Sequence, residues 1–146
     1  MNPRDFLDLA NELAGGSTEA EWRTGVSRAY YAAFHVARQL LTRCGFAVPR
    51  AEQAHGYLWL RLCNAGHVDV GKAGGDLGRL RSFRNAADYD IDKSFDPQLG
   101  STCVLLATDI VQVLEDAAAL PLVLARITAA RRDYERDILK HVTWHP

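Results

Sequence analysis

The segment at 80–92, LRSFRNAADYDID, concentrates side chains that can do chemistry. It places the guanidiniums of Arg81 and Arg84, the carboxylate of Asp88 and the phenol of Tyr89 within ten residues. Arg84 and Asp88 are four residues apart, so a helix would pair them, but such a pair on a surface stabilises a protein by only about 0.3–0.5 kcal/mol. A guanidinium can also grip a phosphate through two donors. The segment therefore predicts a ligand site at a helix end, and a pair that merely locks the helix is the alternative.

A second polar group follows Ser27 in the sequence SRAYYAAFHVARQLL. Arg28, Tyr31, His35 and Arg38 recur at spacings of three, four and three, which places them on one face of a helix. An ordinary solvated face is one interpretation. Adjacent tyrosines and a histidine within an alanine-rich stretch favour a face that meets an aromatic or anionic group instead.

Other candidate motifs are weak. The stretch 71–78, GKAGGDLG, lacks the residue order of a phosphate-binding P-loop and follows no strand, so we expect a plain loop. His141 and His145 are four apart but lie at the terminus without a third ligand nearby. The three cysteines form no metal-binding pattern and are expected to be reduced, mostly buried thiols: Cys44, Cys63 and Cys103. We expect neither a metal nor a cofactor.

Composition and helix-capping or helix-breaking residues define the elements that must position these groups. The chain has 146 residues, of which 48% are hydrophobic and 24% are charged. Its net charge of -1 excludes binding of nucleic acid by bulk charge. An acidic amphipathic N-terminus and the absence of a long apolar run predict a soluble cytoplasmic protein without a membrane partner. Capping residues, glycines and prolines predict helices over about 3–14, 19–44, 51–64, 76–87, 97–120 and 122–140, with a glycine-rich loop at 66–75.

These segments predict an all-α fold, an antiparallel up-and-down helical bundle with an extra C-terminal helix. We expect one domain over 1–146, with the bundle at about 1–120 and a helical extension at 121–146. The extension should dock through Leu122, Val123, Leu124 and Ile127, while 131–137 should lie in solvent because RRDYERD has no wide apolar stripe.

Three features together resemble the HEPN family, in particular its small stand-alone bacterial and archaeal branch. They are SRAYYAAFHVARQLL, the pair His55-Gly56, and LRSFRNAADYD, and the resemblance covers roughly 5–119. It implies a helical bundle that forms a homodimer, with the fourth-helix motifs of both protomers facing one cleft. Many members are metal-independent ribonucleases, often toxins paired with a minimal nucleotidyltransferase antitoxin. A bundle whose second helix carries both an alanine stripe and an aromatic stripe also favours a homodimer.

The family's active motif is an arginine, a polar residue, a short spacer and a histidine. Arg84 and Asn85 match its first two positions, and Asp88 and Tyr89 stand where the histidine is expected. Enzyme activity therefore stays open, because a histidine is the group that titrates near neutrality. His35 is a candidate replacement for it.

The candidate site follows from both the residues and the resemblance. Its candidate catalytic residues are Arg84, Asp88 and Tyr89, and its candidate ligand-binding residues are Arg28, Tyr31, His35, Arg81 and Asn85. The alternatives are an RNA-directed nuclease or a toxin-like remnant that still binds RNA, a non-catalytic module that binds a nucleotide or a partner nucleotidyltransferase, and a purely structural dimer.

Overall fold

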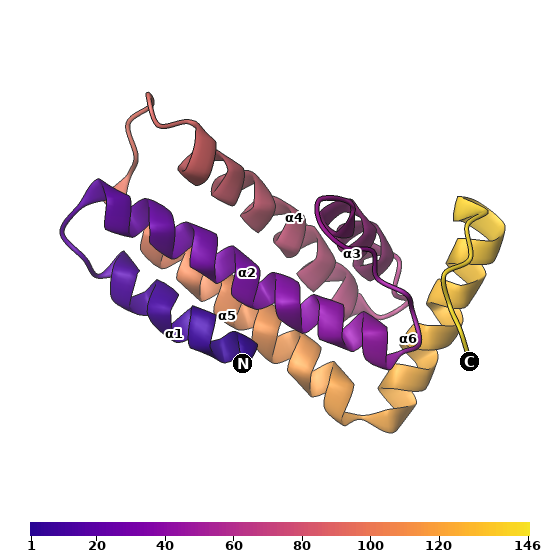
Figure 1. The fold of residues 1–146 in the computed structure, drawn as a ribbon. Helices are drawn as coiled ribbons and strands as arrows, with labels where there is room; N and C mark the ends of the chain where they lie inside the picture. The colour runs from indigo at the N-terminus through magenta and orange to yellow at the C-terminus, as the bar shows by residue number, and fades with distance from the viewer. The chain divides into compact units, whose positions relative to one another are not determined.

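The computed structural model describes residues 1–146 and is all-α (Figure 1). It contains no strand, only an isolated bridge between Phe46 and Trp144, and no helix has the length and apolar character needed to cross a membrane. The all-α prediction is confirmed. The helices are α1 (Pro3–Ala14), α2 (Glu19–Arg43), α3 (Gln53–Cys63), α4 (Val68–Tyr89), α5 (Pro97–Ala119) and α6 (Pro121–Tyr134), followed by the π-helical turn η1 (Glu135–Leu139).

The predicted capping residues begin three of these helices. The side chain of Asn2 accepts a hydrogen bond from the backbone N–H two residues on, at 3.0 Å. Thr18 and Glu21 form a reciprocal capping box, in which each side chain accepts from the other's backbone N–H, at 2.8 and 3.3 Å. Asp96 accepts from the N–H two residues on at 2.9 Å. These bonds satisfy N–H groups that have no partner inside the helix, which explains why α1, α2 and α5 begin where predicted.

The predicted glycine loop at 66–75 is wrong, because α4 begins at Val68 and includes most of it. His67 starts the helix: its carbonyl accepts from the N–H of Gly71 at 2.8 Å and its Nδ1 accepts from Val70 at 3.3 Å. A contact with α3 explains the glycine at position 74, since a Cβ there would lie 2.7 Å from the backbone nitrogen of Cys63. Close packing of the two helices requires the small residue and outweighs its low helix propensity.

The predicted docking of the last helix is only partly right. Ile127 is fully buried as expected, but Leu122 is 87% exposed. The expectation that 131–137 lies in solvent is right for the four exposed residues of this stretch but wrong for Arg131 and Glu135, which are both fully buried. Glu135 can be buried because its carboxylate accepts hydrogen bonds from the backbone of Thr143 and Trp144, at 2.8 and 3.1 Å.

The chain forms two compact units. The first comprises Met1–His35 and Asp76–Val111, and the second comprises Val36–Gly75 and Gln112–Pro146. The arrangement of one domain with an extension after residue 120 stays a prediction.

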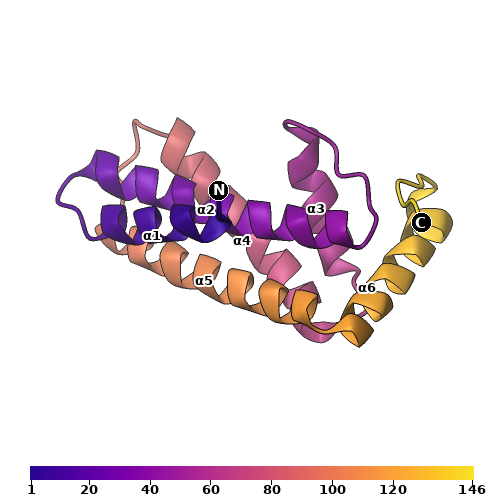
Figure 2. The same ribbon diagram turned by 60° about the horizontal axis from the view of Figure 1, so that its bottom comes forward.

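In the first unit, α1 lies beside the first part of α2 in both views (Figures 1 and 2). Gly25 permits this contact, since a Cβ there would lie 3.2 Å from the carbonyl oxygen of Ala10. The unit also contains the last part of α4 and the first part of α5, and its core includes Val26, Tyr30, Leu80 and Ile110.

In the second unit, the residues after η1 return to the turn that follows α2. The N–H of Ala47 donates to Thr143 at 3.1 Å, the N–H of His145 donates to Gly45 at 2.8 Å, and the indole N–H of Trp144 donates to the carbonyl of Cys44 at 3.0 Å. We call residues 141–146 the C-terminal tail.

The three cysteines of the chain are free, and two of them, Cys44 and Cys103, are buried.

Candidate functional site

Arg84 is the centre of the candidate site in the first unit. It lies on α4 and is only 7% exposed. Its Nη2 donates to the phenol oxygen of Tyr31 at 2.7 Å, and its Nη1 donates to Oδ1 of Asn85 at 2.8 Å. The guanidinium carbon lies 5.4 and 5.2 Å from the ring centres of Tyr30 and Tyr31. One hydrogen bond and two aromatic rings from α2, with a second hydrogen bond to the next residue of α4, therefore fix the orientation of this cation.

The carboxylate of Asp88 lies near Arg84 but makes no hydrogen bond with it. The Nε of Arg84 lies 3.7 Å from Oδ2 of Asp88, and this buried Nε has no hydrogen-bond partner. Oδ2 instead accepts from the hydroxyl of Ser27 at 3.2 Å. The sequence-based picture of a surface ion pair is wrong for Arg84, whose side chain is buried, while that of Asp88 is 31% exposed. The energy of an exposed pair therefore does not describe this contact.

Two further arginines add positive charge here. The guanidinium carbon of Arg28 lies 5.1 Å from the ring centres of both Phe6 and Tyr31. Arg28 makes no ion pair, and its one hydrogen bond, to the hydroxyl of Ser27, is long at 3.4 Å. Arg81 is half-buried and makes neither a hydrogen bond nor an ion pair. Of these three guanidiniums, only that of Arg84 has a carboxylate within 4 Å, that of Asp88.

Tyr30 links Arg81 to this group. Burial raises the pKa of the Tyr30 phenol, and the positive charges of Arg81 and Arg84 act in the opposite direction. Both cations therefore act on the same ring, because residues three apart lie on the same face of α4.

His35 and Tyr89 flank the arginines. The His35 ring stacks on Phe6 with centres 5.9 Å apart and lies 6.3 Å from Tyr31, the residue that binds Arg84. Tyr89 is 71% exposed, and its ring centre lies 6.0 Å from the guanidinium carbon of Arg84. The fold thus gathers the predicted residues of α2 and α4 in one unit, and their roles stay predictions.

Arg23 is a residue that the sequence interpretation missed. Its Nη1 donates to the carbonyls of Ala86 and Ala87 at 3.2 and 3.0 Å, and its Nη2 donates to those of Asp90 and Lys93 at 3.3 and 2.7 Å. These carbonyls belong to the last turn of α4 and the turn after it, where only those of Ala86 and Asp90 also accept a backbone N–H, at 3.0 and 3.1 Å. Arg23 therefore holds the helix end that carries Asp88 and Tyr89.

A spacing signal could have revealed the missed residues. Arg23, Ser27, Tyr31 and His35 follow one another at intervals of four, which keeps them on nearly one face of α2. Three of them bond to α4: Arg23 to its end, Ser27 to Asp88 and Tyr31 to Arg84. The predicted stripe began at Arg28 and therefore did not include Arg23 and Ser27.

The arrangement can bind an anion. Arg84 is oriented but not closely neutralised, and Arg28 and Arg81 make no ion pair. No group of three His, Cys, Asp or Glu side chains is placed to hold a metal ion.

Comparison with known proteins identifies the family. The family model described as HEPN domain matches residues 4–117, a stretch that contains every residue of the candidate site. No curated protein and no solved structure gives a significant match. The matched stretch spans more than half of the sequence, and the helical bundle agrees with it. The chain therefore belongs to the HEPN domain family.

Proposed function

We propose that this HEPN-domain protein binds a phosphate group of RNA or of a nucleotide through Arg28, Arg81 and Arg84, which we call the arginine cluster. The observation that carries the proposal is the unbalanced charge of three guanidiniums, of which only that of Arg84 has a carboxylate within 4 Å, that of Asp88. Arginine binds phosphate through parallel donors, and a cation already held in place loses little entropy on binding.

The purely structural alternative explains the geometry less well. A locking ion pair would bring Asp88 within hydrogen-bond distance of Arg84, but the closest atoms lie 3.7 Å apart and Nε has no partner. A buried donor without an acceptor destabilises a fold and is typical of functional sites. The exposed ring of Tyr89 beside Arg84 offers a surface on which a base can stack.

A homodimer and a nucleotidyltransferase partner, as in a toxin–antitoxin pair, belong to the same proposal. Large apolar side chains stand exposed in the first unit: Tyr89 at 71%, Ile91 at 70% and Leu105 at 68%. Such groups favour contact with another protein. Light scattering should return twice the mass of the chain at micromolar concentration. A monomer mass would contradict the dimer.

A metal-independent endoribonuclease is the second candidate, and the place of His35 next to Tyr31 favours it. Cleavage would need a group that removes the proton of the ribose 2′-hydroxyl and one that protonates the leaving oxygen, and an imidazole suits both roles. The test is incubation of the protein with total RNA in EDTA. Fragments ending in cyclic phosphate that disappear with His35→Ala would support it, and intact RNA would leave binding as the function.

The binding proposal is tested with a fluorescent ten-nucleotide single-stranded RNA and with a fluorescent adenine nucleotide. Arg81→Ala should weaken binding of the preferred probe about tenfold, the effect of one lost charged hydrogen bond. Arg79→Ala is the matched control, since Arg79 lies on the same helix, carries the same charge and is 65% exposed. Its affinity should stay within about twofold of the unchanged protein. Equal losses in both variants, or no binding of either probe, would refute the proposal.

A further inference from the structure

The second unit contains a buried cation with two unused donors. Arg131 of α6 is fully buried, and its Nε and Nη2 have no hydrogen-bond partner. Only Nη1 has a contact, a long one of 3.5 Å to the carbonyl of Ile127. The N–H bonds of Nε and Nη2 point in parallel from one edge of a guanidinium. This is the edge that binds two oxygens of a carboxylate or a phosphate at once.

The one buried carboxylate of this unit is already paired. Glu135 is fully buried and pairs with Arg61, whose Nε and Nη2 lie 2.9 and 2.8 Å from Oε2. Its oxygens also accept from the backbone N–H groups of Thr143 and Trp144 and from the Thr143 hydroxyl. The interior of this unit therefore contains two guanidiniums and one carboxylate.

Arg131 keeps its charge at neutral pH. Burial lowers the pKa of Arg131 to about 10, and the nearby cation Arg61 acts in the same direction. The other groups that act on it electrostatically are Cys44, Tyr57 and Cys63, none of which is an ordinary anion at neutral pH. An isolated buried charge is so unfavourable that folded proteins pair it almost without exception.

We propose that the second unit binds one small oxyanion, a carboxylate or a phosphate group, at Nε and Nη2 of Arg131. A bound oxyanion satisfies both unused donors and balances the interior charge. Two parallel donors favour two bridging oxygens over a spherical halide ion. This site is separate from the arginine cluster and does not depend on the proposed function.

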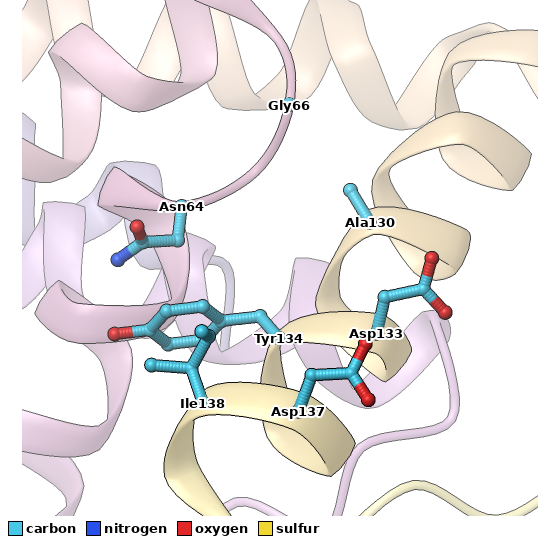
Figure 3. Close-up of a pocket in the computed structure, with 7 residues that line it drawn as sticks. All are labelled: Asn64, Gly66, Ala130, Asp133, Tyr134, Asp137 and Ile138. Atoms are coloured by element: carbon cyan, nitrogen blue, oxygen red, sulfur yellow. The ribbon is translucent and has the colours of Figure 1, made fainter.

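The neighbouring pocket is not this site (Figure 3). Its volume is about 410 Å³, and its polar side chains include the carboxylates of Asp133 and Asp137, which repel an anion. Both carboxylates pair with Arg136, at 3.2 and 2.8 Å. The pocket is lined by Asn64, Gly66, Ala130, Asp133, Tyr134, Asp137 and Ile138.

The C-terminal tail covers the surroundings of Arg131. Thr143 bonds to Tyr57, and the Trp144 indole donates to the carbonyl of Cys44 at 3.0 Å. Tyr57 and Cys44 are both groups that act on Arg131. Because Arg131 has no exposure to solvent, the oxyanion enters when this tail lifts.

The test is thermal unfolding of the full chain in rising concentrations of inorganic phosphate or of acetate, with ionic strength kept constant by sodium chloride. A bound ligand raises the Tm, by about 5 °C for each tenfold increase above its Kd in a protein of this size. Arg131→Met should lose the part of this rise that comes from binding at Arg131, so its Tm should rise less than that of the unchanged protein. Arg126→Met, an exposed position of the same helix, should keep it. Phosphate also stabilises proteins without binding and can bind the arginine cluster, but both effects persist in Arg131→Met.

Arg131→Lys is a second variant, which keeps the positive charge but lacks the parallel donors. It should also lose the part of the Tm rise that comes from binding at Arg131, and it replaces Arg131→Met in the test if that variant does not fold. A response to acetate alone or phosphate alone identifies the anion. An equal rise in the unchanged protein and either Arg131 variant, or no rise with either anion, would overturn the proposal.

Discussion

Arg23→Ala removes the side chain that ties α2 to the end of α4. The side chain donates four hydrogen bonds to backbone carbonyls, two of them partly buried, to Ala86 and Ala87. The buried bonds contribute about 1 kcal/mol each and the exposed ones a few tenths. Loss of the exposed ion pair with Glu19, 2.8 Å long, adds about 0.3–0.5 kcal/mol. We expect the free energy of unfolding to fall by about 3 kcal/mol, which corresponds to a Tm lower by roughly 10 °C.

Thermal unfolding followed by circular dichroism measures the Tm. Amide hydrogen exchange of 86–95 should also become faster, because the turn after α4 loses its anchor. Arg79→Ala is the control, since it removes an exposed arginine from α4 itself and should change the Tm by less than about 2 °C. A Tm for Arg23→Ala within 2 °C of the unchanged protein, with exchange of 86–95 unaltered, would refute the idea that Arg23 holds this helix end.

Three further predictions follow from the packing. Gly74→Ala should lower the free energy of unfolding by about 1–3 kcal/mol in urea titrations, because its Cβ would lie 2.7 Å from the Cys63 nitrogen. Gly75→Ala, with open space at this position, should raise it by up to about 1 kcal/mol, and similar effects at both positions would contradict the packing. Glu135→Gln should lower it by about 3 kcal/mol at pH 7 by leaving a buried cation unpaired. The pKa of Glu135 is lowered in the folded protein, so the stabilisation by its carboxylate is complete above about pH 4.5 and is lost as the pH falls further. In urea titrations, the difference in free energy of unfolding between the unchanged protein and Glu135→Gln should be smaller at pH 3.5 than at pH 7. A constant difference would contradict this. Arg84→Met should lower the Tm by several degrees, since Arg84 is buried and hydrogen-bonded, and an unchanged Tm would restore the surface-pair interpretation.

The family and the helical class could be predicted from short motifs. The two blocks on α2 and α4 suggested the HEPN family, and the family comparison confirms it over 4–117. The starts of α1, α2 and α5 were also predictable, because a capping side chain bonds to a backbone group within three residues of itself. The start of α4 was not, since the reason for Gly74 is a contact with α3 that no local pattern contains.

The candidate site was predictable in its members but not in its contacts. Spacing placed Tyr31 and Arg84 on faces of two helices. The hydrogen bond that joins them links residues 53 positions apart and makes Arg84 a buried cation rather than half of a surface pair. The interval of four places Arg23 on the same face of α2 as Tyr31, but its bonds to carbonyls 63 to 70 positions later depend on the packing of α2 against α4.

The sequence by itself determined the family, the all-α class and the caps of α1, α2 and α5, because these depend on helical periodicity and on bonds between near neighbours. Only the tertiary structure decided which charged residues are buried. The segment RRDYERD is polar at almost every position, yet the fold buries Arg131 and Glu135 within it. Glu135 is stabilised there by Arg61, 74 positions earlier, and the tail is held by Cys44, 100 positions before Trp144. The buried carboxylate of Glu135 depends on donors that lie far from it in the sequence, and no window of local sequence contains Arg61 together with Glu135.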